Sequence, residues 1–279
     1  YTPMIMADSF IYSNLARDME YQICQGKNLT SNKFFGLSLR FVEDRPVVMQ
    51  FAARNAFEFA SAAELAAPYA DGIDLNCGCP QRWALQEGIG AKLMHVDPEH
   101  LKDMIKQARG RTVDTPVSVK IRIYEDRRRT VEFARQIESV GASWITIHGR
   151  RKDQKPSEEI DPDSIKLVKQ ALSIPVIANG NVFTLKEAEE LHNLTGSNGI
   201  MSARGLLENP ALFAGYDKTP WEAVKKYIKL AITYGSCHAI MHHHLVTMLQ
   251  NILPPSSARH FNTLTSIPAI IDFINDHIQ

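Results

Sequence analysis

The side chains best suited to chemistry lie in one short stretch, residues 74–80, which read Asp-Leu-Asn-Cys-Gly-Cys-Pro. A strand that ends at Asn76 and turns at glycine and proline would place an amide and a thiol at the edge of a sheet. We take Cys79 as the candidate reactive group. The alternative is that both cysteines are small buried hydrophobic residues, as most intracellular cysteines are.

Lys120 and His148 are two further candidates at the ends of predicted strands. Lys120 lies among Val117, Val119 and Ile121, where an unpaired ammonium would be costly, so it needs a partner. Alone it could be an ordinary strand-end charge, but beside the other polar strand ends it indicates a cation held for an anionic ligand. His148 follows Ile-Thr-Ile, and a lone histidine there is more often a structural hydrogen bonder than a catalyst.

Two glycine-containing loops follow the last predicted strands. One contains Asn179, Gly180 and Asn181, and the other contains Ala203 and Arg204. Glycines let backbone N–H groups approach an anion, and the last two loops of a (β/α)₈ barrel often bind phosphate. The pair favours a phosphorylated cofactor over simple turns.

Clusters of histidine and arginine suggest other ligands. His238 and residues 242–244 lack an accompanying carboxylate or third ligand, and a single Cys-x-Cys lacks a second pair, so no metal site is predicted. Arg127, Arg128, Arg129 and Arg150 follow predicted strands. Each would be a solvated loop residue by itself, but together they would form a local basic patch for RNA.

Composition narrows the choice of partner and compartment. The 279 residues are 44% hydrophobic and 22% charged, with 31 basic against 31 acidic, so no global field attracts nucleic acid or membrane. No apolar stretch approaches the roughly 18 residues that cross a bilayer. Four cysteines are too few for a disulfide framework, so we expect the cytoplasm or nucleus. Because the first residue is Tyr1, we expect that the natural N-terminus has been removed.

The elements that would position these residues are parallel strands separated by helices. Helix-start signals such as Asp97-Pro98, Asp161-Pro162 and the capping box from Thr184 to Glu187 lie between the strands. Strand, helix, strand repeats predict a parallel sheet. The predicted strands are residues 1–6, 46–51, 72–77, 117–122, 143–148, 175–180 and 199–204.

Spacing favours a (β/α)₈ barrel among parallel folds. Polar residues end successive strands at intervals of 26, 44, 28, 31 and 25 residues, as expected when the carboxyl ends form the active face. These residues are Gln50, Asn76, Lys120, His148, Asn179 and Arg204. A doubly wound sheet is disfavoured because no G-x-G-x-x-G follows the first strand. With seven strands predicted, the first strand of a closed barrel either precedes Tyr1 or is missing.

The pattern changes after the last strand. From Pro220 onwards only amphipathic helices are predicted, separated by a turn at Pro254 and Pro255. We therefore expect an α/β barrel domain over residues 1–215 and an all-helical domain over residues 216–279.

Together these motifs resemble the flavin-dependent tRNA-dihydrouridine synthases. The segments that carry the resemblance are residues 74–82, 90–91, 120–122, 147–150, 175–180 and 201–210. Residues 76–83 and 213–216 look most like the eukaryotic branch that acts at tRNA positions 20a and 20b. The resemblance implies a barrel that binds FMN, NADPH as reductant, and a C-terminal helical domain that holds tRNA. We expect a monomer without a membrane or metal partner.

The resemblance also implies roles for single residues. Cys79 matches the family's general acid, and Asn76 matches a residue beside the flavin and the target uracil. Gln50 and Lys120 match residues at the flavin ring. The implied phosphate-site residues are His148, Asn179, Gly180, Asn181, Ala203 and Arg204.

Two other functions remain open. A free-pyrimidine flavin oxidoreductase would share the barrel and the chemistry, but it has no obvious use for residues 220–279. An inactive tRNA-binding relative would follow if the missing first strand prevents flavin binding.

Overall fold

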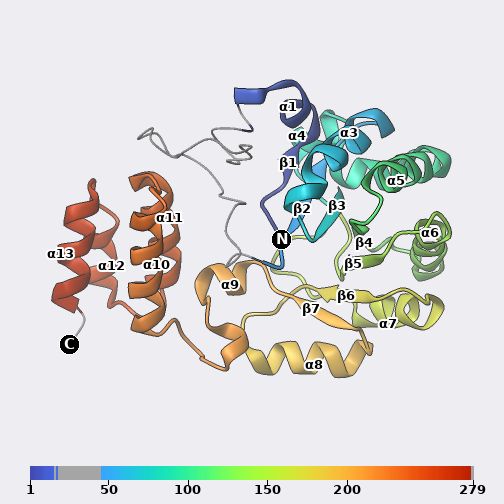
Figure 1. Ribbon diagram of the computed structural model, residues 1–279. Helices are drawn as coiled ribbons and strands as arrows, with labels where there is room; N and C mark the ends of the chain where they lie inside the picture. The colour runs from blue at the N-terminus through green and yellow to red at the C-terminus, as the bar shows by residue number, and fades with distance from the viewer. Residues whose placement is uncertain (16, 18–44, 278–279) are drawn as a thin grey trace. The chain divides into compact units, whose positions relative to one another are not determined.

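The computed structural model describes residues 1–15, 17 and 45–277 (Figure 1). Seven parallel strands pair in the order of the chain, from β1 to β7, and all seven predicted strands are confirmed. The strands are β1 (Ile5–Met6), β2 (Val48–Ala52), β3 (Gly72–Cys77), β4 (Val117–Arg122), β5 (Trp144–His148), β6 (Val176–Asn179) and β7 (Gly199–Met201). A sequential parallel sheet with a helix between strands has the order of a (β/α)₈ barrel.

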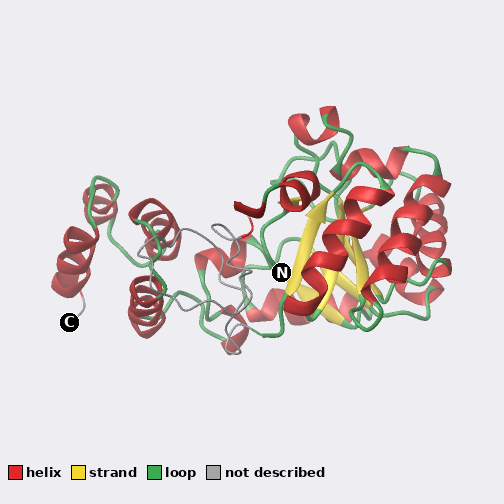
Figure 2. Ribbon diagram, turned by 45° about the horizontal axis from the view of Figure 1, so that its top comes forward, coloured by secondary structure: helices red, strands yellow, loops and turns green. Residues whose placement is uncertain are grey.

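Helices connect the strands and cover one face of the sheet (Figure 2). Helix α3 packs beside α5, α5 beside α6, and α6 beside α7. The helices and short 3₁₀ turns that lie between these strands in the chain are α1 (Ala7–Tyr12), α3 (Ala56–Ala66), η2 (Ala67–Tyr69), α4 (Arg82–Gln86), η3 (Gly90–His95), α5 (Pro98–Thr112), α6 (Arg127–Ser139), α7 (Pro162–Ala171) and α8 (Leu185–Thr195).

The helices begin where the sequence predicts. Asp97 and Asp161 accept hydrogen bonds from backbone N–H groups of α5 and α7, and a proline occupies the first helical position of each. Thr184 and Glu187 form the predicted capping box, since each side chain accepts from the other's backbone N–H, at 3.2 and 2.9 Å.

The two faces of the sheet differ in polarity because successive strand residues point to opposite sides. On β4, Val117, Val119 and Ile121 are fully buried and belong to the apolar side that the helices cover. Ser118 and Lys120 alternate with them and belong to the other side. Paired strands keep this register, so that one face of the sheet collects the polar residues. We call it the inner face.

The chain forms two compact units. Among the described residues, the barrel unit comprises 1–15, 17, 45–181 and 190–201, and the helical unit comprises 182–189 and 202–277. The helical unit contains α9 (Arg204–Glu208), η4 (Leu212–Ala214), α10 (Trp221–Thr233), α11 (His238–Leu249), α12 (Pro255–Phe261) and α13 (Ile267–His277). In the part of the chain that the structure describes, no helix has the length and apolar character needed to cross a bilayer.

The helical unit differs from the prediction at two places. It begins before residue 216, because Ser202 Oγ donates to Val182 O at 2.7 Å and α9 packs against α11. Pro255 does not lie in a turn but starts α12, where its missing N–H costs nothing. The apolar core of α10 to α13 includes Met241, Leu245 and Ile270, all fully buried.

Candidate active site

The inner face brings together five residues that the sequence predicts for the site. Gln50, Asn76, Lys120, His148 and Asn179 come from five consecutive strands near their carboxyl ends. Asn76 lies opposite Lys120 in the strand register, and His148 lies opposite Asn179. Paired residues of parallel strands share a face, so these side chains form one polar surface.

A hydrogen-bonded chain crosses this surface from a buried carboxylate to the loop that carries Cys79. Ser118 Oγ donates to Asp74 Oδ1 at 2.5 Å, and Gln50 Nε2 donates to Asp74 Oδ2 at 2.8 Å. Asn76 Nδ2 donates to Gln50 Oε1 at 2.7 Å, and Asn76 Oδ1 accepts from Cys79 N at 2.9 Å. We call these five residues the relay. An ionised carboxylate only accepts, so Asp74 sets the direction of both amides.

The same buried environment raises the pKa of Asp74 and lowers the pKa of Lys120. Burial raises the pKa of Asp74 to about 6, opposed by the hydrogen bonds from Ser118 and Gln50 and by the charge of Lys120. Burial lowers the pKa of Lys120 to about 8, opposed by the charge of Asp74. Near pH 7 both groups are therefore mostly charged.

Cys79 is held by its backbone while its side chain remains half-buried. Its N–H binds Asn76, and its carbonyl accepts from Ala91 N at 2.9 Å. The side chain packs against Ala52, Ala84 and Ile89. The neighbouring Cys77 is fully buried, and burial raises its pKa well above the usual range. Cys79 is therefore the accessible thiol of the pair.

Gly90 fixes the distance between η3 and Cys79. Its φ of +62° lies in the left-handed region, and a Cβ there would lie 2.7 Å from Cys79 O and 2.8 Å from Cys79 Cβ. We expect Gly90→Ala to displace the thiol and to lower turnover by about 10²-fold, since a misplacement of about 1 Å costs this much. Steady-state kinetics on tRNA would measure the loss.

Gly88→Ala is the matched control. Gly88 has a φ of +76°, and the nearest atom to its added Cβ is Arg54 Cγ at 4.0 Å. Both variants therefore carry a similar backbone strain, but only Gly90→Ala touches Cys79. Equal losses of turnover in the two variants would show that strain in the loop, and not contact with Cys79, decides the effect.

His148 and Arg150 are joined in the loop after β5. Arg150 N donates to His148 Nδ1 at 3.1 Å, so the neutral imidazole carries its proton on Nε2. The Arg150 guanidinium donates to Glu158 O at 2.5 Å and also binds Asn181. Arg150 is only 2% exposed. The prediction that it contacts RNA is therefore corrected to a role inside the loop, where burial and these bonds hold it.

The predicted phosphate-site residues are divided between the two units. Asn179 Nδ2 donates to Met201 O at 2.8 Å, and Gly180, at a φ of +132°, packs against Ile160. In the helical unit, Ala203 precedes α9, and the guanidinium of Arg204 lies 5.2 Å from the ring centre of Phe183. A joint phosphate site made by these residues stays a prediction.

The three consecutive arginines do not lie in a loop, as predicted, but form the first turn of α6. Asp126 caps this helix through Arg128 N at 2.8 Å, so that only residues 123–126 separate α6 from β4. Arg127 forms a bidentate pair with Asp161 at 2.8 and 2.9 Å, which neutralises its charge. Arg129 lies over the ring of Tyr124, 4.3 Å from its centre. The predicted arginine patch is thus weaker than the sequence indicates.

Asp74, Ser118 and Arg122 are inner-face residues for which the sequence predicts no role. Arg122 Nε donates to Gly78 O at 2.7 Å, and its Nη1 donates to Arg151 O at 2.9 Å. It therefore ties the Cys79 loop to the loop after β5. All three alternate with buried apolar residues, and this period of two is the signal that could have found them.

The sheet order and the polar inner face define a barrel-type enzyme whose reactive groups lie at the carboxyl ends of parallel strands. No group of three or more His, Cys, Asp or Glu side chains among the described residues is arranged to hold a metal ion. Comparison with protein families identifies the class further. A family model described as dihydrouridine synthase matches residues 1–266, and the chain belongs to this family.

Relatives with similar sequences have related names. A human protein named as tRNA-dihydrouridine(20a/20b) synthase-like, with NAD(P)+ in its name, is 45% identical over 280 residues, covering 99% of this chain and 82% of the human protein. A tRNA-dihydrouridine(20a/20b) synthase of Schizosaccharomyces pombe is 36% identical, covering 99% of this chain and 79% of the yeast protein. The Saccharomyces cerevisiae protein of the same name is 35% identical, covering 99% and 72%.

Proposed function

We propose that this chain reduces the C5=C6 bond of a uridine in tRNA, at position 20a or 20b, with bound FMN and with NADPH as the reductant. Membership of the dihydrouridine synthase family and the names of the human and yeast relatives support the reaction and the position. The observation that carries the proposal is the relay, because it fixes a half-buried thiol next to a polar inner face.

The inner face fits a flavin in the chemistry of its groups. Lys120 Nζ has no hydrogen-bond or ion-pair partner among the described residues, and Asp74 is already bonded to Ser118 and Gln50. A half-buried lysine without such a partner suits an anionic or electron-rich ligand. Gln50 and Asn76 add amide groups on the neighbouring strands. We propose that Gln50, Asn76 and Lys120 hold the flavin ring and that His148 lies at or near its phosphate.

The chemistry requires a hydride at C6 of uracil and a proton at C5. When bound, FMN would supply the hydride, drawn from NADPH. Cys79 would donate its S–H proton to C5, and the resulting thiolate would be reprotonated by solvent. Asn76 holds the N–H of Cys79, so that the thiol is positioned before the substrate arrives. Lys120 would stabilise negative charge that develops in the site.

A uridine within folded tRNA cannot reach the inner face of a barrel. The base must therefore be extruded from its stack into the site, as in other enzymes that modify bases. We propose that the helices of residues 216–277 hold the surrounding tRNA by its shape. RNA is recognised in this way through its backbone and its unstacked bases.

Reconstitution with pure components tests the proposal. The purified chain is incubated with FMN, NADPH and an unmodified tRNA transcript, and dihydrouridine is mapped by position. Dihydrouridine at 20a or 20b is the expected result. A colourless protein that takes up no added FMN would instead fit a tRNA-binding relative without activity, and reduction of free uracil but not of tRNA would fit a pyrimidine oxidoreductase.

Lys120→Met is expected to slow flavin reduction by NADPH by about 10²-fold, the size of effect seen when one charge-stabilising group is removed. In the unaltered protein the rate should also fall as the pH rises above about 8, because Lys120 then loses its proton. The variant should lack this pH dependence. Anaerobic stopped-flow absorbance measures both, and a variant with the same rate and pH profile as the parent would remove Lys120 from this role.

A further inference from the structure

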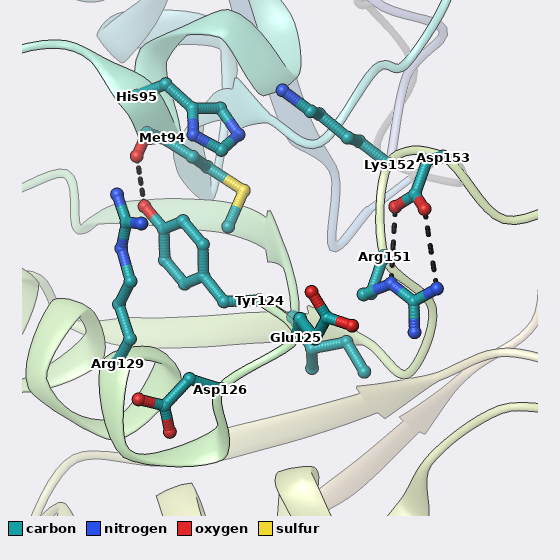
Figure 3. Close-up of a pocket in the computed structure, with 10 residues that line it drawn as sticks. Met94, His95, Tyr124, Glu125, Asp126, Arg129, Arg151, Lys152 and Asp153 are labelled. Atoms are coloured by element: carbon teal, nitrogen blue, oxygen red, sulfur yellow. Dashed lines mark hydrogen bonds and ion pairs between the residues drawn. The ribbon is translucent and has the colours of Figure 1, made fainter.

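A charged pocket lies beside the relay at the carboxyl ends of β4 and β5. It has a volume of about 370 Å³ and is lined by residues 94–95, 123–126, 129 and 151–153 (Figure 3). We call it the Tyr124 pocket. Its volume falls within the roughly 300–1,000 Å³ typical of small-ligand sites. No residue in its lining belongs to the relay, so the pocket is distinct from the relay.

Arg122 connects the Tyr124 pocket to the candidate active site. One side of its guanidinium binds Gly78 O, the carbonyl just before Cys79, at 2.7 Å. The other side binds Arg151 O, in the pocket wall, at 2.9 Å. A ligand in the pocket would therefore lie next to the loop that carries the thiol.

Three cations, Arg129, Arg151 and Lys152, and three carboxylates, Glu125, Asp126 and Asp153, line the pocket. Arg151 pairs with Asp153 at 3.3 Å, so these two charges offset each other. Lys152 is exposed and has no hydrogen-bond or ion-pair partner in the described part of the chain. Arg129 is supported by the ring of Tyr124, whose hydroxyl donates to Met94 O.

The groups around the Tyr124 pocket lower the pKa of His95. Burial lowers its pKa, and the cations of Lys152, Arg129 and Lys92 lower it further. Figure 3 shows Lys152 and Arg129 both extending toward His95, so an anionic group beside this imidazole would meet both cations. Figure 3 also shows the carboxylate of Glu125 between Tyr124 and the Arg151–Asp153 pair.

We propose that the Tyr124 pocket binds one nucleotide of the tRNA strand beside the extruded uridine, with its phosphate on Lys152 and Arg129. This inference rests on the proposed function. Phosphate contacts from lysine and arginine supply position and affinity on RNA. The Glu125 carboxylate is an acceptor for a ribose hydroxyl or a base amino group, so that the pocket suits a nucleotide better than a free inorganic anion.

The salt dependence of tRNA binding tests the pocket directly. Affinity for an unmodified tRNA transcript is measured by fluorescence anisotropy at several salt concentrations. Lys152→Ala should reduce the slope of log affinity against log salt by about 0.7 to 1, because one phosphate contact is lost. Lys155→Ala is the matched control, since Lys155 is an exposed lysine of the same loop that does not line the pocket. Its slope should equal that of the parent.

The outcomes separate this inference from the proposed function. Equal slopes for Lys152→Ala and the parent, or equal decreases in the two lysine variants, would overturn the pocket's role even if dihydrouridine is formed. A decrease confined to Lys152→Ala would support it even if turnover fails. As a second measurement, inorganic phosphate at the concentration of the tRNA phosphates should not displace the transcript. Displacement would mean that the pocket is a simple anion site.

Discussion

Replacing Cys79 by alanine is expected to abolish dihydrouridine formation while FMN remains bound and is still reduced by NADPH. Hydride addition at C6 leaves negative charge that C5 must discharge by taking a proton, and Cys79 is the accessible thiol next to Asn76. A positioned proton donor contributes about 10² to 10⁴ in rate, so turnover should fall by at least 10²-fold. Product mapping by mass spectrometry measures turnover, and the visible spectrum measures flavin.

Cys237→Ala is the control for loss of a thiol. Cys237 is also free and half-buried, but it precedes α11 in the helical unit, whereas the relay belongs to the barrel unit. Its variant should retain full turnover. If Cys79→Ala also turns over at the parent rate, the proton comes from solvent or from another residue, and the relay loses its proposed purpose.

The strands were predictable because their signal is local. Each consists of a short run rich in β-branched and apolar residues, such as Val117 to Ile121, followed by a polar end, and tertiary packing did not override it. Only the ends of the strands differ from the prediction, as at β7, where Ala203 instead precedes α9 and Arg204 begins it. A polar residue can either end a strand or start the helix that follows it. The sequence alone does not distinguish these two positions.

The candidate site was less predictable because its partners are far apart in the sequence. The pairing of Arg127 with Asp161 joins residues 34 positions apart, so a run of arginines gives no sign that one charge is neutralised. Arg150 resembles a surface cation in the sequence, yet its hydrogen bonds to Glu158 and Asn181 bury it. The resemblance to a family is enough to name Cys79 and Lys120. The direction of the relay depends on hydrogen bonds between residues on different strands, which the sequence does not show.

Asp74→Asn is expected to lower turnover by about 10²-fold without removing bound flavin. Asparagine can accept from only one of the two donors that bind Asp74. If its NH₂ faces Gln50 Nε2, two donors meet unless Gln50 flips; if its NH₂ faces Ser118, the hydroxyl must turn to accept it. A flipped Gln50 then presents its own NH₂ to Asn76, which must also flip and turn a donor toward Cys79 N. Reversing one amide therefore disturbs the whole relay, and a displaced thiol costs about this much in rate.

The stability of the same variant gives a second test, independent of turnover. The pKa of Asp74 is about 6 in the folded protein against 3.8 for an ordinary aspartate, so between pH 4 and 6 the folded state retains a proton that the unfolded chain has released. Stability from this group therefore decreases as the pH rises through that window, by roughly 3 kcal/mol in all. Asp74→Asn lacks the ionisable group and should lack this decrease.

Urea unfolding of the flavin-free parent and variant at several pH values between 4 and 7 measures the difference, because contributions from other carboxylates cancel in the comparison. A parent stability that decreases relative to the variant as the pH rises would establish that the carboxylate is buried at a cost. The free-energy cost of burying the Asp74 carboxylate is tolerated because its oxygens orient the amides of Gln50 and Asn76. A constant difference would mean that Asp74 is solvated, and then it could not set the direction of Gln50 and Asn76.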